Sequence, residues 1–362
     1  MKRINIALFS LMLLVVLFSC SKTTLNYTQD GNWILRSTFG GVPRSEAVSF
    51  VIDNFAYVGT GYDPNNPNTR LASFYQFTPA GTQGNWKQVA AMPTGTGRSS
   101  AVAFAVNGKG YVGGGVADNS LRPLNDYYVY LPAPINVWGP IASLKDETGA
   151  PLPRYDAVAF GIGNFGYVTT GYDGSYWLND TWQYDPIADK WNQKVNLPGN
   201  KRSGALSFVY NNKGYVVTGS NGEASSTGAV FDFWVYDPSK PDTSTWTKLR
   251  DIANTNTTDT YDDGYLNIVR NNAVAFTILG TTSGDKAYIT AGKNGSLYSF
   301  TWEYDFATDL WKQKTPYEGP AREGAVGFTV ENRGFVATGI SGTTAFDDLR
   351  EFHPNEVYNA ND

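Results

Sequence analysis

Six copies of one pattern run along this chain of 362 residues, and they constrain its fold more than any other feature. The most regular copy extends from Arg154 to Pro198. Each copy begins with an arginine and continues, after two intervening residues, with an apolar run of the form Ala-Val/Leu-x-Phe or a close variant. The starting arginines are Arg44, Arg98, Arg154, Arg202, Arg270 and Arg322. Residues two apart lie on one side of a strand, so each run predicts a short β-strand within a repeat architecture.

Each copy predicts three further strands. The second carries an aromatic residue followed by Val or Ile and ends in a glycine, as in Tyr167-Val168 and Gly171. A turn such as Asn107-Gly108 joins the first two strands into a hairpin, because both residues tolerate positive φ. The third strand often ends in Tyr-Asp-Pro, where proline stops the hydrogen-bonding ladder, and the fourth carries one tryptophan, Trp191 in this copy. Each copy therefore predicts one sheet of four antiparallel strands.

The sixth copy ends without its tryptophan strand, and the missing strand lies at the other end of the chain. Trp33 precedes Arg44 as Trp311 precedes Arg322. The N-terminal strand can therefore complete the last sheet and close a ring, which hides strand edges that would otherwise template aggregation. We predict an all-β fold: a six-bladed, monomeric β-propeller over residues 32–358, closed by the Trp33 strand and followed by a tail at 359–362.

These features together resemble the Kelch repeat, which forms β-propellers with one four-stranded blade per repeat. The resemblance covers residues 32–358 and rests on the Tyr-Val pair, the glycine ending the second strand, the Tyr-Asp-Pro turn and the late tryptophan. The family's double glycine is present only as Gly114-Gly115, because threonine or alanine replaces the first glycine in the other copies. WD40 propellers fit less well, since no Trp-Asp pair closes a strand. The resemblance implies a Kelch-type propeller.

The first twenty residues are typical of an export signal. A basic start is followed by an apolar run too short to span a membrane, and the run ends at Leu17-Phe18-Ser19-Cys20. These four residues resemble the lipobox of bacterial lipoproteins. The resemblance implies a signal peptide over 1–19, a lipidated Cys20, a polar tether over 20–31 and a place in the cell envelope, with Ser21 favouring the outer membrane. The alternative is an ordinary secretory signal with an incidental cysteine.

The composition argues against several classes of metal site and partner. Cys20 is the only cysteine, so a lipidated chain has no disulfide and no cysteine-ligated metal in its folded part. The chain has 28 basic and 33 acidic residues with no basic cluster beyond the signal, which argues against a nucleic-acid partner. An insert at 254–267 contains Asp259, Asp262 and Asp263, but it lacks the alternating ligands of a calcium loop and is interpreted as solvated. We expect no metal and no cofactor.

Two kinds of loop in a propeller blade emerge on the same face: the loop from the second to the third strand and the link into the next blade. Loops on one face of a scaffold are the usual place for a binding site. The six arginines recur in every copy, so we expect them to be structural. Positions that differ between copies are better ligand candidates, namely Tyr155 and Glu323 directly after the arginine, and Glu46, Ser100, Asp156, Gly204, Asn272 and Gly324 one place later. Glu46 and Glu323 become neighbours once the ring closes.

The first functional hypothesis is a non-catalytic module that binds a protein or a glycan through this face. Aromatic side chains on the loops can stack on a sugar ring or anchor a protein, although they can equally pack against neighbouring loops. The candidate ligand-binding residues are Tyr62, Tyr155, Asp156, Tyr172, Tyr176, Trp177, Asn272 and Tyr298.

The alternative is an enzyme. Bacterial Kelch propellers include the N-acetylneuraminate epimerases, which are sialic acid mutarotases, and this resemblance implies proton transfer at a hemiacetal by carboxylates and an arginine. The candidates for that chemistry are Glu46, Asp156, Glu323, Arg44 and Arg322. Galactose oxidase is also a Kelch propeller, but its copper-radical site needs a Cys-Tyr link and two histidines. This chain has only His353, which we place in a turn of the last blade, so that site cannot be built.

Overall fold

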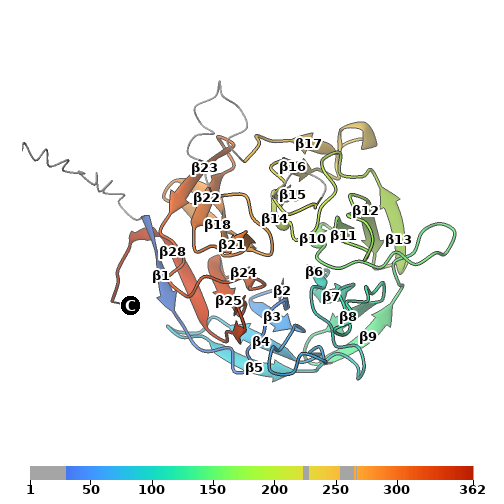
Figure 1. Ribbon diagram of the computed structural model, residues 1–362, viewed down its shortest axis with the longest axis horizontal. Coiled ribbons are helices and arrows are strands. Elements are labelled where there is room, and N and C mark those ends of the chain that lie inside the picture. The colour runs from blue at the N-terminus through green and yellow to red at the C-terminus, as the bar shows by residue number, and fades with distance from the viewer. Residues whose placement is uncertain (1–29, 223–227, 253–264, 266, 362) are drawn as a thin grey trace, which may run out of the picture.

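The computed structural model describes residues 30–222, 228–252, 265 and 267–361, and it shows six four-stranded antiparallel sheets arranged around a central axis (Figure 1). The all-β, six-bladed propeller predicted from the repeats is confirmed. Blade 1 consists of β2 (Val48–Ile52), β3 (Phe55–Gly59), β4 (Phe74–Thr78) and β5 (Asn85–Val89). Blade 2 consists of β6 (Val102–Val106), β7 (Lys109–Gly113), β8 (Tyr127–Leu131) and β9 (Val137–Ile141). Blade 3 consists of β10 (Val158–Ile162), β11 (Phe165–Thr169), β12 (Thr181–Asp185) and β13 (Lys190–Lys194).

The other three blades follow the same order around the ring. Blade 4 consists of β14 (Leu206–Tyr210), β15 (Lys213–Val217), β16 (Phe233–Tyr236) and β17 (Trp246–Lys248). Blade 5 consists of β18 (Val274–Thr281), β19 (Gly284–Thr290), β22 (Thr301–Asp305) and β23 (Leu310–Lys314). Blade 6 consists of β24 (Val326–Val330), β25 (Arg333–Ala337), β28 (Leu349–Val357) and β1 (Asp30–Leu35). Small elements in the loops are the hairpins β20 (Lys293–Asn294) with β21 (Ser296–Leu297) and β26 (Ile340–Ser341) with β27 (Thr344–Ala345), and the 3-10 turn η1 (Asp242–Ser244).

The ring closes through the N-terminal strand, as the Trp33 pattern predicts. β1 pairs antiparallel with β28, with Trp33 opposite Phe352. The Trp33 side chain is fully buried and lies 5.0 Å from the ring of Tyr317 and 6.1 Å from that of Phe276 in blade 5. Blades 5 and 6 are thus joined by a strand from the opposite end of the chain.

His353 does not lie in a turn, contrary to our sequence interpretation. It is part of β28 and faces Asn32 of β1. Pro354 follows it without ending the strand, because β25 pairs only as far as Phe352 and β1 shifts its register between Asp30 and Asn32. Proline is tolerated at such irregular edges, where no ladder hydrogen bond is required.

Neighbouring blades pack through an aromatic ring against a glycine. The Phe50 ring of blade 1 lies where the second strand of blade 2 has Gly110, and a Cβ there would come within 2.2 Å of that ring. Phe104 and Gly166 repeat the arrangement in the next pair of blades, with a distance of 2.0 Å. At Gly110 and Gly166, close packing between blades therefore leaves no room for a side chain.

The two faces of the ring differ in the loops that they carry. One face carries the loops from the second to the third strand and the links between blades, and we call it the mouth face. The opposite face carries the short turns between the first two strands and between the third and fourth strands, and we call it the turn face. β28 runs from the mouth face to the turn face, and its end pairs with Asp30, so the described chain enters on the turn face.

Several sequence predictions concern residues outside the described ranges. These are the signal peptide at 1–19, the lipidated Cys20, the tether up to residue 29 and the acidic positions Asp259, Asp262 and Asp263. β1 begins at Asp30, inside the segment that we predicted as tether. In the described part of the chain, no helix is long and apolar enough to cross a membrane.

Candidate functional site

A closed ring of backbone hydrogen bonds surrounds the axis at the mouth face. In each blade, the residue two places after the arginine donates its N–H to the carbonyl of the equivalent residue in the preceding blade, with donor–acceptor distances of 2.7 to 3.0 Å. The bond from Glu46 N to Gly324 O, at 2.7 Å, closes the ring between blades 1 and 6. The members of this ring are Glu46, Ser100, Asp156, Gly204, Asn272 and Gly324. Positions that differ between the repeats thus meet around one opening, which we call the channel mouth.

All six residues of the ring have left-handed backbone conformations, with φ between 50° and 61°. Glycine, asparagine and aspartate tolerate this region, whereas Glu46 and Ser100 are strained there by about 1–2 kcal/mol each. Strain of this kind is retained where the surrounding structure fixes the backbone, and it often marks a functional site. Backbone strain therefore marks Glu46 and Ser100 as candidate functional residues.

The channel mouth is asymmetric although the backbone ring is regular. Side chains extend from Glu46, Ser100, Asp156 and Asn272, and the cavity that they line has a volume of 120 Å³. Gly204 contributes no side chain, and a Cβ there would meet Asn272 Oδ1 at 2.6 Å. Below the mouth, the channel continues through a cavity of 230 Å³ lined largely by alanines and valines. The mouth thus offers a polar opening that can distinguish the two sides of a ligand.

Asp156 has the most perturbed acid group at the mouth. Burial raises the pKa of its carboxyl to about 7, and the negative charge of Glu46 acts in the same direction. A hydrogen bond from the Ser100 hydroxyl and the charge of Lys293 oppose this rise, while Glu323 adds to it. Burial also raises the pKa of the neighbouring Tyr155. Near neutral pH, the Asp156 carboxyl can therefore both give and take a proton.

Aromatic side chains form a row beside the mouth on blade 3. Tyr155 pairs with Tyr172, and Tyr172 pairs in turn with Trp177, as single antiparallel bridges. The ring centroids of Tyr155 and Tyr172 are 5.6 Å apart, and those of Tyr172 and Trp177 are 5.1 Å apart. Tyr176 does not belong to this row and is 67% exposed. The structure thus brings three of the predicted aromatic candidates together next to Asp156.

The other predicted aromatic candidates lie in separate environments. Tyr62 covers the guanidinium of Arg70, which lies 4.7 Å from the ring centroid, and Arg70 donates to the Ser99 hydroxyl at 2.9 Å. Tyr298 packs against Phe300 and lies 5.2 Å from the guanidinium of the buried Arg270. Tyr298 therefore contributes to the packing of blade 5.

Lys293 is a residue of the mouth face that sequence reasoning missed. Its ammonium group lies 2.7 Å from the carboxylate of Glu323, and its charge acts on Asp156. It directly follows the glycine that ends the second strand, which is the position of Tyr62 and Tyr172 in blades 1 and 3. Comparing that position across the copies would have identified it. Glu323 is therefore paired with a cation of blade 5.

The six repeated arginines are buried within the blades and do not open into the channel mouth. Each is at most 1% exposed. Arg154 shows the arrangement: it forms an ion pair with Asp180 at 2.8 Å and donates to the carbonyl of Thr170. Arg44 and Arg322, which we considered for mutarotation, are likewise occupied inside their own blades, Arg44 by Ser73 and Arg322 by Asp348. Neither guanidinium is placed to contact a ligand at the mouth.

No group of three or more His, Cys, Asp or Glu side chains that could hold a metal ion occurs in the described ranges. The single histidine binds Glu356 at 2.8 Å and lies 3.1 Å from Glu351, on the outer strands of blade 6. The groups at and beside the mouth are carboxyl, hydroxyl, amide and aromatic groups, together with the ammonium of Lys293.

Comparison with known proteins identifies the family. Residues 45–261 match the family model described as the KLHDC2/KLHL20/DRC7 Kelch-repeats domain. The chain belongs to the Kelch-repeat family. Among solved structures, this Kelch propeller is similar to one titled "Structure of YjhT", with a TM-score of 0.65 and 18% identity over 87% of this chain and 95% of the other. That likeness concerns the fold.

Curated relatives of this Kelch propeller include bacterial N-acetylneuraminate epimerases. That of Haemophilus influenzae strain 86-028NP is 27% identical over 201 residues, covering 47% of this chain and 51% of the relative. That of Shigella sonnei strain Ss046 is 23% identical over 206 residues, covering 56% and 49%. The chain thus spans about half the length of the curated relatives that it matches.

The departure of this Kelch propeller from the family's double glycine has a structural explanation. The first residue of the pair takes φ of 57° to 64° in the four blades where it is threonine. Its carbonyl accepts a hydrogen bond from the buried arginine of the same blade, as Thr170 does from Arg154. This bond and the surrounding strands hold a conformation that threonine disfavours by about 1–2 kcal/mol.

Proposed function

We propose that this Kelch propeller binds carbohydrate at the channel mouth of the mouth face. One observation carries the proposal: a polar opening formed by Glu46, Ser100, Asp156 and Asn272 lies beside the aromatic row of Tyr155, Tyr172 and Trp177. Sugars combine hydroxyl groups, which need fixed hydrogen-bonding partners, with flat C–H faces, which pack on aromatic rings.

The size of the opening limits how a sugar can be held. The cavity of 120 Å³ is smaller than the roughly 300–1,000 Å³ of a pocket that encloses a drug-sized ligand. A substituent of the sugar, such as a hydroxymethyl, carboxyl or glycerol group, fits the opening, while the ring rests on the aromatic row outside it. Such a site recognises one residue of a glycan and leaves the remainder exposed.

A second candidate function is interconversion of sugar anomers. The Asp156 carboxyl favours it, since burial and Glu46 raise its pKa to about 7, near the value at which a general acid–base group works best at neutral pH. Asp156 would transfer a proton to or from the ring oxygen or anomeric hydroxyl, and the hydroxyl of Ser100 would orient it. The name of the curated relatives, N-acetylneuraminate epimerase, supports testing sialic acid first.

The two functions are separated by one pair of experiments on the chain from residue 21 onward. A glycan array with wild type and Trp177→Ala tests binding, and NMR exchange spectroscopy of N-acetylneuraminate with wild type and Asp156→Asn tests mutarotation. Binding without accelerated exchange supports the module, and exchange that Asp156→Asn abolishes supports the enzyme. An array without any signal, together with exchange at the uncatalysed rate, would contradict both and favour a protein ligand.

We also propose that Cys20 anchors the propeller to the outer membrane. Asp30 lies on the turn face, so a tether from Cys20 would reach the propeller on the side opposite the channel mouth. The mouth would then face away from the membrane and remain accessible. Metabolic labelling with a palmitate analogue tests the anchor, because wild type should incorporate label and Cys20→Ser should not. Equal labelling of both would contradict it.

A further inference from the structure

The channel mouth carries hydrogen-bond acceptors on alternate blades. Blade 1 contributes the Glu46 carboxylate, blade 3 the Asp156 carboxyl and blade 5 the Asn272 amide, and all three residues line the cavity of 120 Å³. Blades 4 and 6 contribute Gly204 and Gly324, which have no side chains. The backbone ring has one member from each of six blades, so residues on alternate blades surround the axis at similar angles. The acceptors thus enclose the opening from three sides.

The two acid groups of the mouth have no cation of their own. In the part of the chain that the structure describes, neither Glu46 nor Asp156 forms an ion pair. The cation whose charge acts on Asp156 belongs to Lys293, and its ammonium group is paired with Glu323 at 2.7 Å. Glu323 and Lys293 shift the pKa of Asp156 in opposite directions, so this pair leaves little net charge at the mouth. The opening therefore keeps an excess of negative charge.

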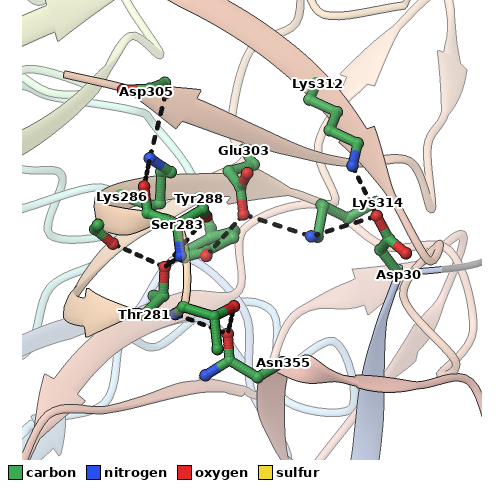
Figure 2. Close-up of polar contacts among 12 residues, drawn as sticks. Asp30, Thr281, Ser283, Lys286, Tyr288, Glu303, Asp305, Lys312, Lys314 and Asn355 are labelled. Carbon is green, nitrogen blue, oxygen red and sulfur yellow. Dashed lines mark hydrogen bonds and ion pairs between the residues drawn. The ribbon is translucent and has the colours of Figure 1, made fainter. Parts of the chain in front are cut away.

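A second, larger cavity shows the opposite situation. This groove of 540 Å³ lies between blades 5 and 6 on the turn face. Three of its carboxylates lie against ammonium groups, as Figure 2 shows: Asp30 against Lys312 at 2.6 Å, Asp305 against Lys286 at 3.2 Å, and Glu303 against Lys314 at 3.4 Å. The charges of the groove thus compensate one another, whereas those of the mouth do not.

The aromatic row favours the same sign of ligand charge as the acid groups. Burial raises the pKa of the Tyr155 hydroxyl, and the charges of Asp156 and Glu46 raise it further, so this side chain lies close to both. The faces of tyrosine and tryptophan rings attract cations electrostatically. Carboxylates and aromatic faces beside one opening therefore favour a ligand that is positively charged.

A primary ammonium group matches the mouth in size, charge and donors. It is compact enough for an opening of 120 Å³, and it has three N–H donors and no acceptor. Each donor can face one of the three acceptors on alternate blades. A carboxylate in the same place would lie near Glu46 and Asp156, where like charges repel, and a hydroxyl would leave the negative charge without compensation.

We propose that the channel mouth binds the protonated amine of an amino sugar, with its N–H groups directed at Glu46, Asp156 and Asn272. The sugar ring lies outside the opening, on the aromatic row. This inference rests on the carbohydrate binding proposed above and names the class of sugar that binds most tightly. Neutral sugars bind at the same place without the contribution of the charge.

Calorimetric titration of the chain from residue 21 onward at pH 7 tests the proposal. The probes are glucosamine and galactosamine, each compared with its neutral parent sugar and with its uncharged N-acetyl derivative. At least one of the two amines should bind about tenfold or more tightly than its parent sugar, because its hydrogen bonds to the mouth are charge-assisted. The N-acetyl derivative should show no such gain.

Two variants identify the groups that select the amine. Glu46→Gln and Asp156→Asn should each reduce the preference for the amine over its parent sugar several-fold, and two variants keep the test valid if one fails to fold. Asp118→Asn is the control, because Asp118 accepts from the backbone N–H of Ser120 in a loop of the mouth face and does not line the opening. It should leave the preference unchanged.

NMR gives a readout that depends on the ligand charge alone. In carbon-detected spectra, the amine should lower the titration midpoint of Asp156 and the parent sugar should not, because a nearby cation favours the ionised carboxyl. Equal affinities of wild type for the amines and their parent sugars would overturn the amine proposal and leave carbohydrate binding intact. A preference that survives both Glu46→Gln and Asp156→Asn would also overturn it. Binding of no sugar in either series would refute both proposals for the mouth.

Discussion

The raised pKa of Asp156 makes a prediction about stability that can be measured without any ligand. The carboxyl ionises near pH 3.8 under ordinary conditions and near 7 in the folded protein. Between these values, the folded state keeps a proton that the unfolded chain has lost, so folding becomes less favourable as the pH rises. Below about pH 4 both states are protonated, and above about pH 7 both are ionised. The free energy of unfolding should therefore fall through this window and then stay constant.

The size of the effect follows from the same two values. A rise from 3.8 to about 7 corresponds to about 4 kcal/mol, at about 1.4 kcal/mol for each pKa unit. Asp156→Asn removes the charge and tolerates the φ of 50° at this position. The free energy of unfolding of the variant, relative to that of wild type, should therefore rise by about 4 kcal/mol between pH 4 and pH 8.

Urea unfolding of wild type and Asp156→Asn at several pH values from 4 to 8 measures this gain. Asp53→Asn serves as a control, because Asp53 also has positive φ, at 52°, but lies exposed in a hairpin turn of the turn face. Its difference from wild type should not follow the pattern of Asp156→Asn. If the stability difference between Asp156→Asn and wild type were the same at pH 4 and pH 8, the pKa of the Asp156 carboxyl would not lie near 7. The case for acid–base chemistry at the mouth would then fail.

Three further predictions concern the same structure. Glu46→Gln should lower the titration midpoint of Asp156 in carbon-detected NMR, because the Glu46 charge raises that pKa, and an unchanged midpoint would show that the two groups do not interact. Trp33→Ala should lower the free energy of unfolding in urea by about 3–5 kcal/mol. Leu35→Ala is the control and should have little effect, because Leu35 is 46% exposed. Equal unfolding midpoints for the two variants would contradict ring closure by β1. Arg154→Lys should lower the free energy of unfolding by about 1–3 kcal/mol, since lysine cannot form both hydrogen bonds to Asp180. An unfolding midpoint equal to that of wild type would refute the buried pair.

Repetition made most of the fold predictable. A pattern that returns six times reveals its strands even where one copy is irregular, and the missing tryptophan strand of the last copy could be found at Trp33. The same comparison located the channel mouth, because the ring positions occupied by Glu46 and Asp156 are those where the copies differ. Blade geometry then brings them around one axis.

The parts that the sequence did not predict depend on distances between blades. Burial of Arg44 and Arg322 could not be read from their repetition alone, although repetition favoured a structural role. The approach of Lys293 to Glu323 depends on how two neighbouring blades meet, which no single copy of the repeat shows. His353 was placed in a turn because Pro354 follows it, and only the pairing with β1 shows why the strand continues.

Binding of sugar at the channel mouth is the central claim, and saturation-transfer NMR tests it most directly. N-acetylneuraminate and a panel of neutral sugars would be measured with wild type, Trp177→Ala and the control Tyr298→Ala, which alters a tyrosine packed away from the aromatic row. We predict transfer to at least one sugar with wild type and with Tyr298→Ala, and its loss with Trp177→Ala. Transfer to no sugar with wild type, or undiminished transfer with Trp177→Ala, would contradict the claim.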